Sequence, residues 1–158
     1  MAKVKRSQFK TFMDTTPATT PTWSLVGPGV TTGTVNYNPE ATTETYIHED
    51  NATTVVEKYA PTFPIEATAI NTDAVFEFID NLRRTRAVLD AAETDILMVY
   101  LYETAVSTDQ YPAELQHVSI QIDSWGGDGG VANKINYTIN FIGDPTTGLY
   151  DVSANSFA

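Results

Sequence analysis

Three things are scarce in this sequence: cysteine, basic side chains and long apolar runs. None of the 158 residues is a cysteine, which excludes disulfides, thiolate metal ligands and cysteine nucleophiles together. No segment approaches the ~18 consecutive apolar residues of a membrane-spanning helix, so we expect no membrane insertion by this chain. The basic start is not followed by an apolar stretch, and we therefore expect no export signal.

Basic side chains are few and unevenly placed. The chain has nine lysines and arginines against twenty acidic residues. Four of the nine lie within residues 1–10, which contain no acid, so the rest of the chain is strongly acidic. An acidic body cannot gain the counterion release that drives nucleic-acid binding, although acidity also keeps many ordinary proteins soluble. Any role near DNA must therefore avoid binding it tightly.

The first part of the chain is rich in threonine and proline and favours extended structure. Residues 1–22 combine the basic cluster with 15-TTPATTP-21, a composition that predicts a flexible N-terminal arm. Residues 43–47 and 54–59 read as two β-strands around the polar turn 48-HEDNAT-53. This pattern predicts a long hairpin with an acidic tip.

One segment has clear helical periodicity. Its apolar side chains recur at a spacing of three to four residues, and either Asn71 or Thr72 can cap its start. We therefore expect a helix over about residues 72–85. The apolar stripe consists of Val75, Phe76, Ile79 and Leu82.

Two later segments, 116–123 and 134–142, alternate strictly between apolar and polar residues. They predict an antiparallel hairpin joined by 124-SWGGDGGVAN-133, in which glycine gives access to positive φ. The outward face is polar, short and nearly uncharged, which suits either an ordinary wetted sheet or a surface that lines an open space. Its residues are Ser119, Gln121, Asp123, Asn136, Thr138 and Asn140.

No motif predicts catalysis. The glycine-rich stretch lacks the Lys-Ser/Thr pair of a phosphate-binding loop, and a strand rather than a helix follows it. The only histidines, His48 and His117, are too far apart in the pattern to favour a metal site, and no G-x-S-x-G motif is present. We expect a protein that is not an enzyme, with no catalytic residue, no cofactor and no metal.

About eight short strands surround the single helix. This pattern predicts an α+β fold that is mostly β, a two-sheet β-sandwich or barrel with one flanking α-helix and long hairpin loops. We expect three parts: an N-terminal arm at residues 1–22, a β-sandwich domain at 23–145 and a C-terminal extension at 146–158. After residue 143 we expect loop and a loose end.

The whole chain resembles the major tail protein, or tail tube protein, of long-tailed bacteriophages. The resemblance covers nearly the full length and has no catalytic signature. It is carried by 3-KVKRSQFKTF-12, 30-VTTGTVNYNPE-40, 43-TETYIHED-50, 75-VFEFIDNLRRTRAVL-89 and 117-HVSIQIDSWGGDGGVANKINYTINFIGDP-145.

The resemblance implies a structural virion protein. Six subunits would form a ring, their inner sheets would join into one barrel, and stacked rings would form the tube for genome delivery. Partners would be other copies of the chain, the tape measure protein and other tail proteins. Double-stranded DNA would pass through without specific binding. The protein would be made in the bacterial host cytoplasm and reside in the phage tail.

Combined with the resemblance, the charge distribution and the polar alternation of the sequence lead us to expect roles for three groups of residues. The polar face of the last hairpin would face the lumen, and the tip residues His48, Glu49, Asp50 and Asn51 would contact the next ring. Lys3, Lys5, Arg6 and Trp125 would contact a neighbouring subunit.

Two alternatives remain at this stage. A ligand-binding β-sandwich module without catalytic activity would also account for the fold and acidity, and it predicts a monomer or dimer. A small hydrolase would instead lose activity when His48 or His117 is changed.

Overall fold

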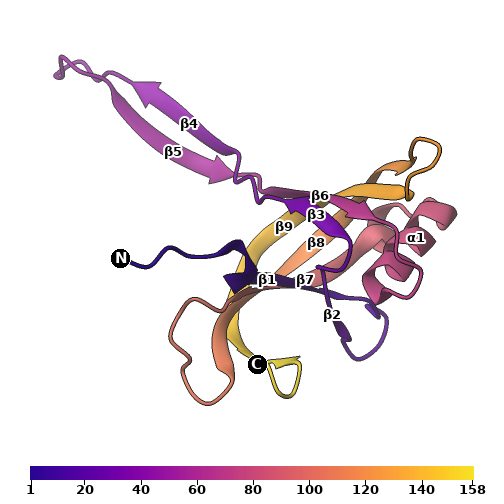
Figure 1. Ribbon diagram of the computed structural model, residues 1–158. Coiled ribbons are helices and arrows are strands. Elements are labelled where there is room, and N and C mark those ends of the chain that lie inside the picture. The colour runs from indigo at the N-terminus through magenta and orange to yellow at the C-terminus, as the bar shows by residue number, and fades with distance from the viewer.

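The structure, a computed structural model that describes residues 1–158, is dominated by one large antiparallel sheet from which a long hairpin projects (Figure 1). A single α-helix packs against the sheet, and two short 3₁₀ turns, η1 (Arg6–Gln8) and η2 (Leu89–Ala92), complete the helical content. The predicted fold class, α+β and mostly β with one flanking helix, is confirmed. The strands of the body form one curled sheet, and the second sheet is the projecting hairpin.

The large sheet has the strand order β2-β1-β7-β8-β9-β6-β3, with β10 added to the far end of β9. Sequence neighbours β8 and β9 lie side by side at its centre, and every pairing in it is antiparallel. The strands are β1 (Phe9–Asp14), β2 (Trp23–Leu25), β3 (Val30–Gly33), β6 (Thr62–Thr68), β7 (Glu93–Tyr100), β8 (Gln110–Gly126), β9 (Lys134–Asp151) and β10 (Ser156–Phe157).

The hairpin predicted from the two alternating segments is confirmed, and it is longer than expected. β8 begins at Gln110, before the expected segment 116–123, and β9 continues to Asp151, where a loose end was expected. The expectation of a loop after residue 143 is wrong because Gly143 starts a bulge rather than a strand end. Beyond that bulge the chain pairs with β8 again, and Tyr150 is buried.

Part of the expected N-terminal arm belongs to the sheet. Residues 9–14 form β1, which pairs with β2 on one side and β7 on the other, and Met13 is fully buried. Pairing on both sides and the burial of Met13 fix this part of the expected arm in the sheet. Residues 1–5 alone precede the first regular element, and they extend away from the sheet (Figure 1). The division of the chain into an N-terminal arm, a domain and a C-terminal extension stays a prediction.

The long hairpin near residues 40–59 is confirmed. It consists of β4 (Pro39–Glu44) and β5 (Thr53–Tyr59), which pair only with each other. The two strands stand clear of the main sheet (Figure 1), and all seven residues of β5 are exposed.

The predicted helix is α1 (Ala74–Thr85). Its N-cap is Asp73 rather than Asn71 or Thr72, because the Asp73 carboxylate accepts a hydrogen bond from the backbone N–H of Phe76 at 3.2 Å. The helix ends at Arg86, which adopts the left-handed conformation of a C-cap.

The main core lies between α1 and one face of the sheet. Alternate residues of β6, β7, β8 and β9 meet the apolar stripe of the helix there, and Tyr137, Ile139 and Ile79 are almost completely buried. A smaller cluster around Leu97, Val99 and Tyr150 covers one end of the opposite face. The rest of that opposite face carries the polar side chains.

Replacing Ile79 by alanine tests this packing. Because the side chain is fully buried in the main core, the substitution is expected to lower the free energy of unfolding by about 2–5 kcal/mol. The matched control, Asn81→Ala on the exposed side of the same helix, should stay within ~0.5 kcal/mol of the unmodified protein. Urea unfolding followed by circular dichroism measures both, and equal values would contradict the helix placement.

Candidate functional site

The six polar residues predicted on the last hairpin lie together on one face of β8 and β9. Ser119 is paired with Asn140, and Gln121 with Thr138. Asp123 is the extra residue of a bulge in β8. Because the bulge adds one residue, its neighbour Ser124 instead of Asp123 stands opposite Asn136.

The bulge gives the Asp123 carboxylate two donors on the same face. Thr138 Oγ1 donates to Asp123 Oδ2 at 2.6 Å, and Gln121 Nε2 donates to Asp123 Oδ1 at 2.7 Å. Asn140 Nδ2 donates in turn to the side-chain oxygen Oε1 of Gln121 at 3.4 Å. These lateral bonds hold the side chains along the sheet rather than away from it, and they use part of the donors of this face.

Strand β6 extends the same face on one side. Thr62, Pro64 and Glu66 pair with alternate residues of β9, and their neighbours Phe63 and Ile65 point into the core. On the other side, Glu93 and Asp95 of β7 pair with β8. We call this continuous surface the polar face. It comprises Thr62, Pro64, Glu66, Glu93, Asp95, His117, Ser119, Gln121, Asp123, Asn136, Thr138 and Asn140.

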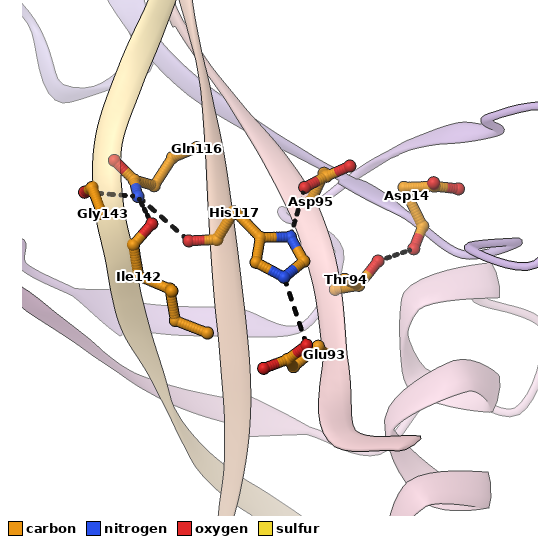
Figure 2. A network of polar contacts seen from close by, with 8 residues as sticks. All are labelled: Asp14, Glu93, Thr94, Asp95, Gln116, His117, Ile142 and Gly143. Carbon is orange, nitrogen blue, oxygen red and sulfur yellow. Dashed lines mark hydrogen bonds and ion pairs between the residues drawn. The ribbon is translucent and has the colours of Figure 1, made fainter. Parts of the chain in front are cut away.

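The charges on the polar face are almost all negative. Lys134 stands at its end, where β9 begins opposite Gly126 and Thr68. His117 is the one other basic group, and it lies between two carboxylates: its Nδ1 is 2.8 Å from Asp95 Oδ1 and its Nε2 is 3.3 Å from Glu93 Oε2 (Figure 2). With both ring nitrogens next to acceptors, the doubly protonated ring fits this site best.

The two carboxylates also change the titration of His117. The hydrogen bond to Asp95 is the largest cause that raises the pKa of His117 above its usual value near 6.5; partial burial opposes it, and Glu93 adds to it. This cluster was not among the predicted sites, because Glu93, Thr94 and Asp95 form a polar run in the sequence, next to the apolar run that begins at Ile96. Only the pairing of Glu93 with Ser119 and of Asp95 with His117 brings these carboxylates onto the polar face.

A buried glutamine sits behind the polar face, next to His117. Gln116 is 1% exposed, and its Nε2 donates to the backbone oxygens of Ile142 at 2.9 Å and Gly143 at 3.2 Å (Figure 2). Those oxygens belong to the place where β9 bulges, with Gly143, Asp144 and Pro145 opposite the single residue Gln116. The amide therefore satisfies backbone acceptors that the bulge takes out of the ladder.

The remaining predicted site residues lie elsewhere. His48, Glu49, Asp50 and Asn51 lie at the tip of the β4–β5 hairpin, where Thr53 donates to Glu49 at 3.2 Å. Next to them on the hairpin, large apolar side chains are exposed to solvent. They are Tyr46, Ile47, Val55, Val56 and Tyr59.

Two predicted contact residues are engaged within their own chain. Trp125 is 40% exposed and stacks on Phe76, and the Arg83 guanidinium lies over its ring at 4.4 Å. Arg6 donates to the backbone oxygens of Phe9 at 2.7 Å and Gly33 at 3.2 Å. Of the predicted arm residues, Lys3 and Lys5 have no ion-pair partner in the structure.

The glycine-rich stretch after Trp125 is a hairpin connection, as predicted. Gly126 and Gly130 have φ values of +124° and +84°, which other residues rarely adopt. No group of three His, Asp or Glu side chains is arranged to hold a metal ion. The helices of the structure are all too short or too polar to cross a membrane.

The sequence matches no protein-family model, and no curated protein matches it. Comparison with solved structures is informative. A chain from the tail of an empty gene transfer agent (GTA) particle, determined with C6 symmetry, superposes with a TM-score of 0.65 at 9% identity, covering 91% of this chain and 98% of that one. This chain has the fold of that tail protein.

A second solved structure is less similar. A chain from the six-fold symmetrised baseplate of an anti-feeding prophage has a TM-score of 0.48 and 10% identity, and the match covers 93% of this chain and 97% of that one. The assignment of the fold rests on the GTA tail.

The His117 cluster predicts a pH-dependent contribution to stability. Because its pKa is raised in the folded state, the stabilisation is complete below the pKa of the unfolded chain and is lost as pH rises through the folded value. His117→Gln should therefore lower the melting temperature at pH 5.5 and leave it unchanged at pH 9. The effect should be below ~1 kcal/mol, because solvent screens a side chain that is 47% exposed.

The matched control is His48→Gln at the hairpin tip, away from the polar face. It should shift the melting temperature equally little at both pH values. If His117→Gln lowered the melting temperature equally at both pH values, the ring would stabilise the fold by packing rather than by charge.

Proposed function

We propose that this protein is a structural subunit of a phage-type tail tube, with no catalytic role. Six copies form a ring, and rings stack into the conduit through which the genome passes. The observation that carries this proposal is the polar face, an acidic surface that runs across four strands. The fold shared with a GTA tail protein supports it.

The polar face suits a channel wall for DNA. A lysine on such a wall would attract phosphate and release counterions, which strengthens binding and slows passage. Across this face, β6 to β9 offer carboxylates, amides and hydroxyls, and the one imidazole is already held between Asp95 and Glu93. Asp123 occupies the Thr138 hydroxyl and one N–H of Gln121, so these two donors are not free to bind phosphate oxygens.

The edges of the main sheet favour lateral assembly. β2 and β3 are the outermost strands, and each pairs on one side only. Unpaired strand edges normally favour aggregation, but in a closed ring they are used for contacts between subunits. We propose that the polar faces of six copies join in this way around the lumen, with Ser119, Gln121 and Asn140 among the lining residues.

The β4–β5 hairpin is proposed to contact the next ring. A two-stranded hairpin is at best marginally stable in water, and this one exposes Val55, Val56 and Tyr59. Burying these side chains against a stacked copy would stabilise both hairpin and tube. The tip from His48 to Asn51 would then make polar contacts at the end of that interface.

The proposal also sets the biological context. The protein would be a virion component made in the host cytoplasm, and the tape measure protein and other tail proteins would be its partners during assembly. Double-stranded DNA would pass through the tube without specific binding.

Electron microscopy of the purified protein tests the assembly. Hexameric rings or hollow filaments are expected, with a central channel in end views. Monomers or dimers at all protein concentrations would contradict the proposal and favour a ligand-binding module.

Lysine substitutions test the lumen assignment. Gln121→Lys and Asn140→Lys should each allow tubes to form but slow DNA release from particles several-fold, because every ring would gain six cations facing the phosphates. Asn81→Lys on the exposed side of α1 is the charge-matched control and should release DNA at the normal rate. If both polar-face variants behave like this control, the polar face does not line the channel.

A further inference from the structure

Among the first five residues of the chain, only Lys5 is hydrogen-bonded to the rest of the protein, through its backbone N–H and C=O to Gln8 at 2.8 and 2.9 Å. Met1 to Lys5 are all exposed, Val4 is 58% exposed, and neither Lys3 nor Lys5 forms an ion pair. Arg6 fixes the point from which they leave the body, because it is bound to the backbone oxygens of Phe9 and Gly33. From there the segment extends into solvent, away from the rest of the chain (Figure 1).

A groove of about 810 Å³ lies at the base of the β4–β5 hairpin. We call it the base groove. It runs between the hairpin, the core-side face of β7 and β8, and the bulge of β9, so it lies on the opposite side of the sheet from the polar face. Its apolar lining is Tyr37, Tyr59, Pro61, Met98, Phe141 and Pro145.

The aromatic part of the base groove is open to solvent. Tyr37 is 54% exposed and Tyr59 is 60% exposed, and their rings meet edge to face with centroids 6.4 Å apart. Partly exposed tyrosines around an apolar recess are typical of the residues that contribute most to protein–protein interfaces.

The base groove also carries uncompensated negative charge. Glu57, Glu114 and Asp144 line it, and none of them has a basic partner in the structure. The one lysine of the lining, Lys58, is already paired with Glu40, with Nζ 3.2 Å from Oε2. The groove therefore combines an apolar floor with carboxylates that a basic segment could neutralise.

We propose that the base groove binds residues 1–5 of a neighbouring copy of this chain. In an extended segment, successive side chains point to opposite sides, so Lys3 and Lys5 face the carboxylates while Val4 faces the apolar lining. This inference rests on the proposed function, since assembly brings the neighbour within reach. It also accounts for a basic start on an otherwise acidic chain.

Crosslinking between engineered cysteines tests the contact directly, because the chain has no cysteine of its own. Val4→Cys and Asp144→Cys are made in separate, differently tagged proteins, which are mixed, assembled and oxidised. A disulfide-linked dimer with one copy of each tag is expected. The control pair, Val4→Cys with Asn81→Cys on the exposed side of α1, should give none.

Two results would overturn the inference. One is the absence of the mixed dimer in assembled material. The other is a disulfide that forms only when both cysteines are in one chain, which would mean that the arm binds its own groove. Both positions are exposed, so folding is not at risk.

Charge exchange gives an independent measurement. Lys3→Glu combined with Lys5→Glu should raise the protein concentration needed for tube formation roughly threefold to tenfold, the effect expected for two exposed ion pairs. Adding Glu114→Lys and Asp144→Lys should restore most of the loss. If the arm variant assembles at the normal concentration, the base groove does not bind the arm.

The two proposals fail in different ways. Normal rings or tubes from the unmodified protein, without the crosslink and without an effect of the arm variant, would remove only the docking of the arm. If the unmodified protein forms no rings, the proposed tube is wrong. The crosslink between the two tagged proteins would then still show, in dimers or other small oligomers, whether the arm binds the base groove of another copy.

Discussion

The register between β8 and β9 is the constraint on which the rest of the structure depends. In a sheet, a shift by one residue moves every side chain to the other face, so this pairing alone separates the core from the polar face. On one side it stacks Val118, Ile120 and Ile139 under the helix; on the other it sets Gln121 against Thr138. Two bulges, one at Asp123 in β8 and one after Ile142 in β9, interrupt the regular pairing of these strands.

Each bulge has a separate consequence. The bulge at Asp123 places a carboxylate where it accepts from Gln121 of its own strand and from Thr138 of β9, which links these side chains of the polar face by hydrogen bonds. The bulge after Ile142 is held by the Gln116 amide, and it turns Asp144 and Pro145 outward to form one wall of the base groove. Small irregularities in one strand pair thus shape both surfaces to which we assign a role.

A single copy of the chain leaves much unfinished. The β4–β5 hairpin exposes valine and tyrosine side chains, the side chains of the first five residues are exposed, and two sheet edges lack partners. Each of these features costs stability or solubility in isolation, and each is removed when another copy covers it. The polar face exposes no comparable valine or tyrosine side chains, and under the proposed function it faces the lumen instead of another copy.

Local sequence was enough to predict the helix near 72–85, the glycine turn after Trp125 and the polar alternation of residues 116–123 and 134–142. These depend on interactions between residues close in the chain. β1, the continuation of β9 and the union of His117 with Glu93 and Asp95 could not be predicted, because they depend on partners far away in the sequence. Composition determined that the chain is acidic and free of cysteine, whereas only strand pairing decided which of its charges meet.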